Sequence, residues 1–262
     1  MKLTFLGTGT SFGVPVVGCG CAVCSSADPR DRRTRSGAVL ELPGGTLLVD
    51  ASPELRLQLL AADVRRLDAV WITHPHADHL HGLDDLRIFS VRSGRDLDVH
   101  VAAEHADEIR TRFRYAFDDA PQPPGTSRPQ LRLRPHDGLA ALDLCGTSVR
   151  PLPVPHGDKT VFGLRVGPLG YVTDAKLLTP EALAGLAGVE TLVLSALWWG
   201  DPHPTHFNIE EAIEAARTVG ARRTWLTHLT HRSSHADLER TLPDDVRPAH
   251  DGLTLDLRTE LR

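Results

Sequence analysis

Short hydrophobic runs and longer amphipathic segments divide the chain into two similar halves. Runs of strand length, rich in branched and aromatic residues, occur at 2–6, 38–42, 46–50, 69–73, 97–101, 131–133, 142–149, 161–166, 169–173, 191–197, 224–226 and 253–257. Helical spacing and helix-start signals mark 52–62, 80–91, 104–117, 180–187, 208–219 and 234–241. Strands come first in each half, and then strands and helices alternate. This order predicts two packed sheets with helices outside, although a three-layer α/β fold would produce the same order.

Two segments lack either pattern and are predicted to be loops. Residues 14–35 contain three of the four cysteines among small and charged residues, and residues 118–129 contain four prolines. We find no linker or internal repeat, so we expect residues 1–262 to form a single domain with a cysteine-bearing loop at about 14–35.

Composition and charge narrow the class of protein. The chain has 262 residues, of which 41% are hydrophobic, so it is not wholly disordered. Lys+Arg number 29 and Asp+Glu 34, and this net charge of −5 argues against binding nucleic acid through bulk positive charge. No apolar run approaches the roughly 18 residues of a membrane helix, and the first residues do not resemble a secretion signal. We therefore expect a cytoplasmic protein, without membrane contact, whose cysteines are reduced.

The strongest chemical signal is the sequence HxHxDH directly after the strand at 69–73. Its four donor side chains are those of His74, His76, Asp78 and His79. In a loop that leaves a strand, His74 and His76 can converge on one divalent ion while Asp78 and His79 face a second. Two ions about 3.5–4 Å apart can hold a bridging hydroxide and stabilise both the attacking and the leaving oxygen of a displacement.

More donors occur at the ends of other apolar strands. His156 follows a proline-rich apolar run, Asp174 follows Tyr171-Val172-Thr173, and His228 ends the strand around 224–226. As a carboxylate, Asp174 can bridge two cations. Each of these residues taken alone is as compatible with a structural role as with a functional one.

HxHxDH followed by spaced His, Asp and His resembles the metallo-β-lactamase superfamily over nearly the whole chain. The resemblance implies a four-layer αββα sandwich of mixed α and β (α+β) structure. It also implies one ion bound by His74, His76 and His156, a second bound by Asp78, His79 and His228, and Asp174 as the bridge. The substrate remains open because this superfamily includes enzymes that cut lactams, thioesters, lactones, phosphodiesters and RNA.

A second metal site is predicted from the cysteines. Cys19, Cys21 and Cys24 supply three soft ligands, and His231, three residues after His228, can complete a Cys₃His zinc site. The alternative is three reduced surface cysteines. We expect the isolated Cys145 to be a core residue.

The glycines at 7, 9 and 13, the cysteine loop and the His228–His231 pair resemble the PhnP-type cyclic phosphodiesterases of the phosphonate pathway. This resemblance implies zinc at the cysteines and two active-site ions, manganese or zinc. It also implies catalytic roles for Asp78 and for His206, which precedes a helix as the family's catalytic histidine does. Lys159 is a candidate phosphate-binding residue, but its loop is one residue longer than the family loop. The segment Trp198–Pro204 has no counterpart that we can place.

The function that follows is metal-dependent hydrolysis of a small phosphodiester, with a cyclic ribosyl phosphate as the expected substrate and a bridging hydroxide as the nucleophile. His206 would protonate the leaving oxygen or donate a hydrogen bond to it. One alternative is a nuclease that processes transfer-RNA 3′ ends, against which the acidic balance argues. Another is a non-catalytic PqqB-like binding or carrier protein, for which we would expect an incomplete ligand set. A homodimer is left open.

Overall fold

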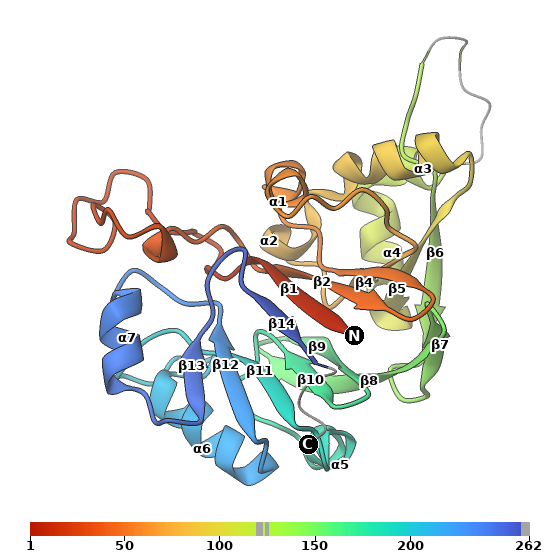
Figure 1. Ribbon diagram of the computed structural model, residues 1–262. Helices are drawn as coiled ribbons and strands as arrows, with labels where there is room; N and C mark the ends of the chain where they lie inside the picture. The colour runs from red at the N-terminus through yellow and green to blue at the C-terminus, as the bar shows by residue number, and fades with distance from the viewer. Residues whose placement is uncertain (119–122, 124–125, 258–262) are drawn as a thin grey trace.

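The computed structural model describes residues 1–118, 123 and 126–257. Within these residues two seven-stranded β-sheets pack face to face between layers of helices (Figure 1). The first sheet has the order β14-β1-β2-β3-β4-β5-β6. Its strands are β1 Lys2–Gly7, β2 Gly37–Leu42, β3 Gly45–Val49, β4 Ala69–Ile72, β5 Leu97–Ala102, β6 Leu131–His136 and β14 Thr254–Asp256.

The second sheet repeats this arrangement with the order β13-β12-β11-β10-β9-β8-β7. Its strands are β7 Leu142–Leu144, β8 Thr147–His156, β9 Lys159–Val166, β10 Leu169–Val172, β11 Thr191–Ser195, β12 Arg223–Thr227 and β13 Val246–Pro248. Strands β3 to β6 are parallel in the first sheet, and β10 to β13 are parallel in the second. The carboxyl ends of each parallel set therefore lie along one edge of its sheet.

Helices cover the outer face of each sheet. Over the first sheet lie α1 Leu55–Ala61, α2 Ala77–Leu80, α3 Arg87–Ser93 and α4 Ala103–Arg112, and over the second lie α5 Pro180–Leu186, α6 Ile209–Val219 and α7 His235–Thr241. Short 3₁₀ turns occur at Pro29–Asp31, Leu83–Leu86 and Arg114–Ala116. The predicted four-layer αββα sandwich is confirmed.

Alternation along the strands explains why three apolar cores form. Val70 and Ile72 of β4 pack beneath the helices of the first sheet, whereas Trp71 points into the core between the sheets. Trp71 is fully buried, and its Nε1 donates to the carbonyl oxygen of Phe162 at 2.8 Å. The backbone N–H of Phe162 in turn donates to the Thr73 carbonyl oxygen at 3.0 Å. These bonds join the two sheets immediately beside the HxHxDH segment.

Several predicted elements differ in the structure for identifiable reasons. The helix expected at 80–91 is interrupted at Gly82, whose N–H donates to the Ala51 carbonyl oxygen at 2.8 Å. A Cβ at Gly82 would lie 2.0 Å from the Ser52 carbonyl oxygen, so only glycine permits this close approach. The strand expected at 142–149 is split by a turn at Cys145 and Gly146, with φ of 51° and 68°. Cys145 is therefore a half-buried turn residue and not a core residue.

Strand β8 extends further than predicted, through three prolines. Pro151, Pro153 and Pro155 pair on one side with β9, while β7 reaches only as far as Val149 on the other side. Proline has no backbone N–H to donate. At these positions an N–H would point away from β9, so the prolines cost the β8–β9 ladder no hydrogen bond. Strand β13 was not predicted, and the proline-rich loop expected at 118–129 lies partly outside the described residues. Among the described helices, none is long and apolar enough to cross a membrane.

Candidate functional site

The predicted metal ligands gather where β4, β8, β10 and β12 end. The HxHxDH segment follows β4, His156 ends β8, Asp174 follows β10 and His228 follows β12. Asp174 and His228 have φ of 51° and 59°, which is the left-handed region. This conformation turns the chain sharply as it leaves each strand. The structure thus brings together donors that are separated by more than 150 residues in the sequence.

The first group of donors consists of His74, His76 and His156, whose ligand atoms lie within 4.8 Å of one another. His74 Nε2 lies 2.9 Å from His76 Nδ1. His156 donates from Nδ1 to the carbonyl oxygen of Thr205 at 3.0 Å, which leaves its Nε2 free as a ligand atom. The loop expected around His156–Thr160 is the tip of the β8–β9 hairpin, where His156 pairs with Lys159 across the turn.

A second group contains Asp78, His79, Asp174 and His228, again with ligand atoms within 4.8 Å of one another. Asp174 Oδ2 lies 3.3 Å from His79 Nε2, and its Oδ1 lies 3.4 Å from His228 Nε2. The same Oδ2 lies 3.8 Å from His74 Nε2 and 4.0 Å from His156 Nε2. Asp174 therefore faces both groups, as a bridging carboxylate would.

Charge in this cluster favours a cation at its centre. Burial acts to raise the pKa of Asp174, but His228 and His79 together hold it well below its usual range. Burial acts to lower the pKa of His79, but Asp174, Asp78 and Asp50 together raise it well above its usual range. His74 is instead kept neutral, because burial and then the neighbouring His79 lower its pKa.

The donor atoms of the cluster are also chemically suited to binding divalent ions. His79 Nε2, His228 Nε2 and His228 Nδ1 are buried and have no hydrogen-bond partner among the described residues. An unpaired buried polar atom is costly, and coordination to an ion would satisfy the Nε2 atoms of His79 and His228. Imidazole with a few carboxylates is a donor set that suits zinc and manganese. The residues present therefore fit two neighbouring ions.

Asp50 belongs to this site although it was not predicted. It directly follows β3, has φ of 62°, and accepts from His79 Nδ1 at 2.6 Å. The N–H and hydroxyl of Thr73 donate to it at 2.8 and 2.9 Å. A carboxylate in this position fixes the tautomer and the orientation of a ligand histidine. Its location at the end of an apolar strand, shared with Asp174, was the signal that could have revealed it.

The cysteine group lies in the predicted loop, which projects from the sheets (Figure 1). Sγ atoms of Cys19, Cys21 and Cys24 lie 3.5, 3.4 and 3.4 Å from Nδ1 of His231. Tetrahedral zinc, with bonds of about 2.3 Å to sulfur and about 2.0 Å to nitrogen, separates such atoms by about 3.5 Å. Hydrogen bonds from the Cys24 N–H and from His231 lower the pKa of Cys21 to about 6, which favours the thiolate that binds metal.

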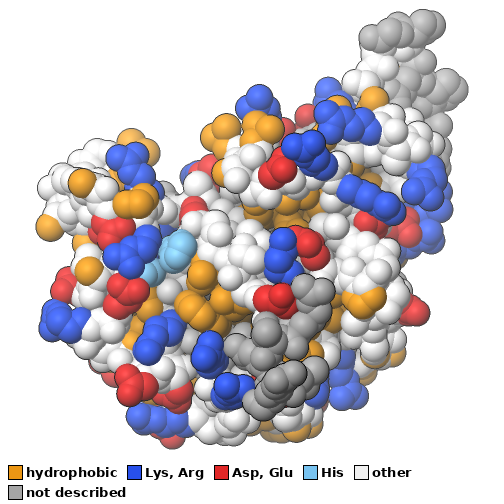
Figure 2. Space-filling model, in the orientation of Figure 1, with side chains coloured by type: hydrophobic (Ala, Val, Ile, Leu, Met, Phe, Trp, Pro, Cys, Tyr) orange, Lys and Arg blue, Asp and Glu red, His pale blue; other side chains and the backbone are white. Residues whose placement is uncertain are grey.

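A buried polar network anchors this loop to the sheets. Arg33 is 3% exposed, and its Nη1 donates to Thr8 Oγ1 at 2.8 Å and to the Ala249 carbonyl oxygen at 2.6 Å. Asp251 accepts from the N–H and the hydroxyl of Thr8 and of Thr34. These hydrogen bonds fix the base of the loop. Hydrophobic side chains cover part of its projecting surface (Figure 2).

His206 lies beside both groups of donors. Its ring centroid is 4.6 Å from that of His156 and 4.9 Å from that of His228, on which it stacks. His206 also forms a possible ligand group with His156 and Asp174. Burial and the neighbouring imidazoles, opposed by Asp174, lower the pKa of His206 to about 3. The structure thus places His206 at the cluster, while its role stays a prediction.

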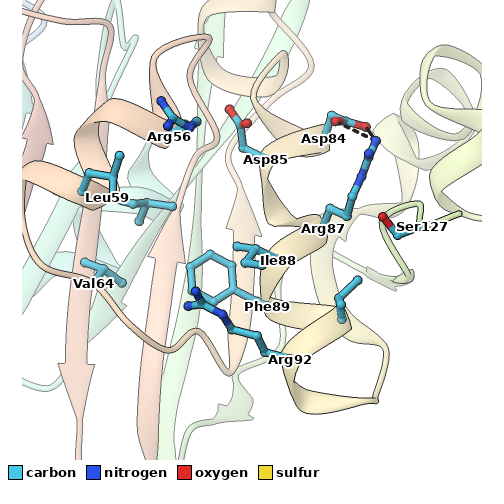
Figure 3. Close-up of a pocket in the computed structure, with 12 residues that line it drawn as sticks. Arg56, Leu59, Val64, Asp84, Asp85, Arg87, Ile88, Phe89, Arg92 and Ser127 are labelled. Carbon is cyan, nitrogen blue, oxygen red and sulfur yellow. Dashed lines mark hydrogen bonds and ion pairs between the residues drawn. The ribbon is translucent and has the colours of Figure 1, made fainter. Parts of the chain in front are cut away.

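Lys159, which was predicted, and His203 and His81 lie around the rim of the cluster. Lys159 Nζ forms an ion pair with Glu108 at 3.1 Å, so its charge is partly neutralised. His203 lies 5.0 Å from His206 between ring centroids, and His81 makes an edge contact with Phe113 on the far side of His76. A separate depression of about 490 Å³ lies between α1 and α3 (Figure 3). None of the predicted ligands lines it.

A model of the beta-lactamase superfamily domain matches residues 46–229, which include every donor of the two histidine–aspartate groups. The chain belongs to the metallo-β-lactamase superfamily. The crystal structure of a diphosphatase from the PhnP family superimposes with a TM-score of 0.88 and 35% identity, covering 97% of both chains. The expectation of a metallo-β-lactamase-fold hydrolase that resembles the PhnP type is thereby confirmed at the level of the family.

Two related proteins have names that differ from each other and from that of the diphosphatase. An octanoyltransferase of Porphyromonas gingivalis is 37% identical over 258 residues, which are 97% of this chain and 51% of that protein. A ribonuclease Z of Bradyrhizobium is 31% identical over 170 residues, which are 62% of this chain and 52% of that protein. The chain spans about half the length of these relatives. Their names therefore do not decide its substrate.

Proposed function

We propose that this protein is a metal-dependent phosphodiesterase that hydrolyses a small phosphodiester, with a cyclic ribosyl phosphate as the first candidate substrate. The observation that carries the proposal is Asp174, whose Oδ2 lies within 4.0 Å of histidines from both groups of donors. The similarity to a PhnP-family diphosphatase supports hydrolysis at phosphorus. We further propose that manganese or zinc occupies the two groups and that zinc occupies the cysteine group.

Each donor group has a definite part in this proposal. One ion would be held by His74, His76 and His156. The other would be held by Asp78, His79 and His228, and Asp174 would contact both ions. Bound there, the ions would lower the pKa of water toward about 7 and polarise the phosphoryl oxygens. Asp50 keeps His79 oriented, and the carbonyl oxygen of Thr205 does the same for His156.

His206 would act on the leaving group. Its Nδ1 is buried without a partner among the described residues, so the accessible Nε2 is the atom that can meet a substrate. Because its lowered pKa keeps the His206 ring neutral near neutral pH, an Nε2–H hydrogen bond would stabilise the departing alkoxide, and general acid help of this kind is worth about 10²–10⁴-fold. Lys159 would contact the phosphate at the rim, in competition with its ion pair to Glu108.

Two other functions are less well supported. Nuclease activity calls for a basic surface that neutralises several phosphates, whereas this chain has a net charge of −5. Many of its arginines are paired with acids, as Arg30 is with Asp28 and Glu239. A carrier protein of the PqqB type would not require a complete ligand set, whereas the donor atoms within each histidine–aspartate group of this chain lie within 4.8 Å of one another.

A panel of matched esters tests the proposal. Metal-loaded protein should hydrolyse phosphoribosyl 1,2-cyclic phosphate or other small phosphodiesters, and leave thioesters, lactones and precursor transfer RNA intact. Asp174→Ala serves as the background control. Diester turnover no faster than this variant's, or a preference for precursor transfer RNA, would contradict the proposal. Preference for the cyclic ribosyl ester would also support a place in phosphonate metabolism, and fractionation of cells would test the cytoplasmic location.

A further inference from the structure

A cavity of about 310 Å³ is lined by His231 of the cysteine group and by Trp198, which precedes the segment that leads to His206. Its walls come from three segments: the turn at Phe12, the start of the Trp198–Pro204 segment, and the residues around His231 and Arg232. It is thus built partly from the segment that has no recognised counterpart in the PhnP pattern. We name it the aromatic subsite.

Phe12 is held at the mouth of this subsite by the backbone. The N–H of Gly13 donates to the Thr10 carbonyl oxygen at 2.8 Å, which closes a tight turn around Phe12. Gly9 bridges to Leu229 beside it, so the turn is fixed against the end of β12. Nevertheless 73% of the Phe12 side chain is exposed. A large aromatic side chain on a fixed turn at a cavity wall is placed to contact a ligand.

The opposite wall combines an aromatic ring with a cation. Trp198 Nε1 donates to the Asp201 carbonyl oxygen at 2.8 Å, which sets the orientation of the indole. The guanidinium carbon of Arg232 lies 3.8 Å from the Trp198 ring centroid. Within the described part of the chain no carboxylate pairs with Arg232. Its hydrogen-bond donors are therefore free for a polar ring edge or a phosphate.

A row of rings leads from this wall to the proposed reaction centre. His203 lies 5.6 Å from Trp198, His206 lies 5.0 Å from His203, and His228 lies 4.9 Å from His206 between centroids. The cysteine group fixes the other side of the subsite, because His231 both lines the cavity and contacts the three sulfurs. A ligand that extends along this row of rings would reach both the subsite and the histidine–aspartate donors.

We propose that the aromatic subsite receives the base of a nucleoside whose phosphate is the scissile phosphodiester. Planar bases stack on aromatic side chains and on guanidinium planes, and Phe12, Trp198 and Arg232 supply both. The inference rests on the proposed function and refines it, because it favours a nucleotide ester over a base-free ribosyl phosphate. The reaction is unchanged: water adds to phosphorus, and the ester oxygen leaves with a proton.

Two esters that differ only in the base provide the test. These are the methyl esters of adenosine 5′-monophosphate and of ribose 5-phosphate, with released methanol as the readout. Phe12→Ala should raise KM for the adenosine ester about tenfold with kcat unchanged, and leave the ribose ester unaffected, because stacking is worth about 1–3 kcal/mol per base. Phe12→Tyr should retain the wild-type KM. Val17→Ala is the matched control, since Val17 is 99% exposed on the same loop and does not line the cavity.

Calorimetric binding of adenosine 5′-monophosphate and ribose 5-phosphate separates this inference from the proposed function. The wild type should bind the nucleotide about tenfold more tightly, and Phe12→Ala should lose that preference. Equal effects of Phe12→Ala on both ligands, or none on either, would overturn the subsite even if both esters are hydrolysed. A Phe12-dependent preference for the nucleotide without turnover of either methyl ester or of the cyclic ribosyl ester would instead refute the phosphodiesterase.

Discussion

Asp174 is the residue at which the two donor groups meet, and it shows what a single side chain contributes. Its carboxylate lies within 4.0 Å of four histidines from three strand ends, and it is almost fully buried. The neighbouring His228 and His79 keep its pKa low against the effect of burial. Such a carboxylate is stable only with positive charge close by, and the two proposed ions would supply it.

Replacing His76 with Ala tests the first donor group. We expect His76→Ala to abolish diester turnover and to reduce the metal content while the fold remains. His76 is only half-buried, so its truncation leaves no large cavity. Turnover, elemental analysis and circular dichroism would be measured on the same sample, with His81→Ala as the neighbouring control. Wild-type turnover in His76→Ala would remove this residue from the site.

The role of His206 can be tested by varying the leaving group of the substrate. If its ring assists the departing oxygen, His206→Ala should slow hydrolysis of alkyl or sugar diesters by about 10²-fold or more. A nitrophenyl ester needs little protonation and should lose much less. Metal content should stay constant. Equal losses on both esters would eliminate leaving-group assistance, and loss of metal would make His206 a ligand, as its grouping with His156 and Asp174 permits.

Residue identity made most of this site predictable, but not all of it. The spacing in HxHxDH and the donors at strand ends are local signals, and the structure brings those donors together. Asp50 was missed because an acid after a hairpin strand is common, and only its 2.6 Å contact with His79 distinguishes it. The ion pair between Lys159 and Glu108 could not be predicted from the sequence either, because it joins β9 to α4.

At the scale of elements, the cysteine loop is an irregular segment whose order depends on a few contacts. Its regular structure consists of the 3₁₀ turn Pro29–Asp31 and two isolated bridges, Val14 with Arg33 and Arg35 with Gly9. Arg33 and Asp251 fix its base, while His231 meets the cysteines near its tip. A loop with so few backbone bonds is a segment that bound zinc would stabilise strongly.

Cys21→Ser should therefore lower the melting temperature more than it changes turnover per folded molecule. Zinc binding adds to the folding free energy, and a lost ligand removes part of it. Cys145→Ser is the matched control, because that cysteine lies in a turn away from the group. Finding no tightly held zinc in wild-type protein with reduced cysteines would refute the zinc site.

The elements that were predicted incorrectly are those set by tertiary contacts. The break at Gly82 depends on its approach to Ser52, and the length of β8 depends on the edge position of its prolines. Neither is visible in hydrophobic periodicity. By contrast, α6 was predicted almost to the residue, because Asn208 and Glu211 form a capping box and Gly220 ends the helix.

At the scale of the whole molecule, the core between the sheets contains a histidine that should make stability depend on pH. His136 stacks on Trp71 at 4.6 Å and meets Phe162 edge-on at 5.9 Å. Burial, with His100 nearby, lowers the pKa of His136 from 6.5 to about 4. The unfolded chain therefore binds more protons than the folded one between these values.

Stability should accordingly fall as the pH is lowered through the window from 6.5 to 4. His136→Asn removes the titrating group and keeps an acceptor for the Gly138 N–H, which donates to His136 Nδ1 at 3.1 Å. Across this window we expect the free energy of unfolding of His136→Asn to change by on the order of 1–2 kcal/mol less than that of the wild type. Urea unfolding at several pH values would measure this slope. An unchanged slope would show that His136 does not contribute.

Reconstitution of metal-free protein tests the central claim most directly, because it follows metal content and diester hydrolysis in the same sample. The account predicts three ions per chain, of which one resides at the cysteines. Hydrolysis should appear only as the other two bind, and Asp174→Ala should prevent this without loss of the cysteine-bound zinc. Full diester turnover with a single bound ion, or none with all three bound, would contradict the account.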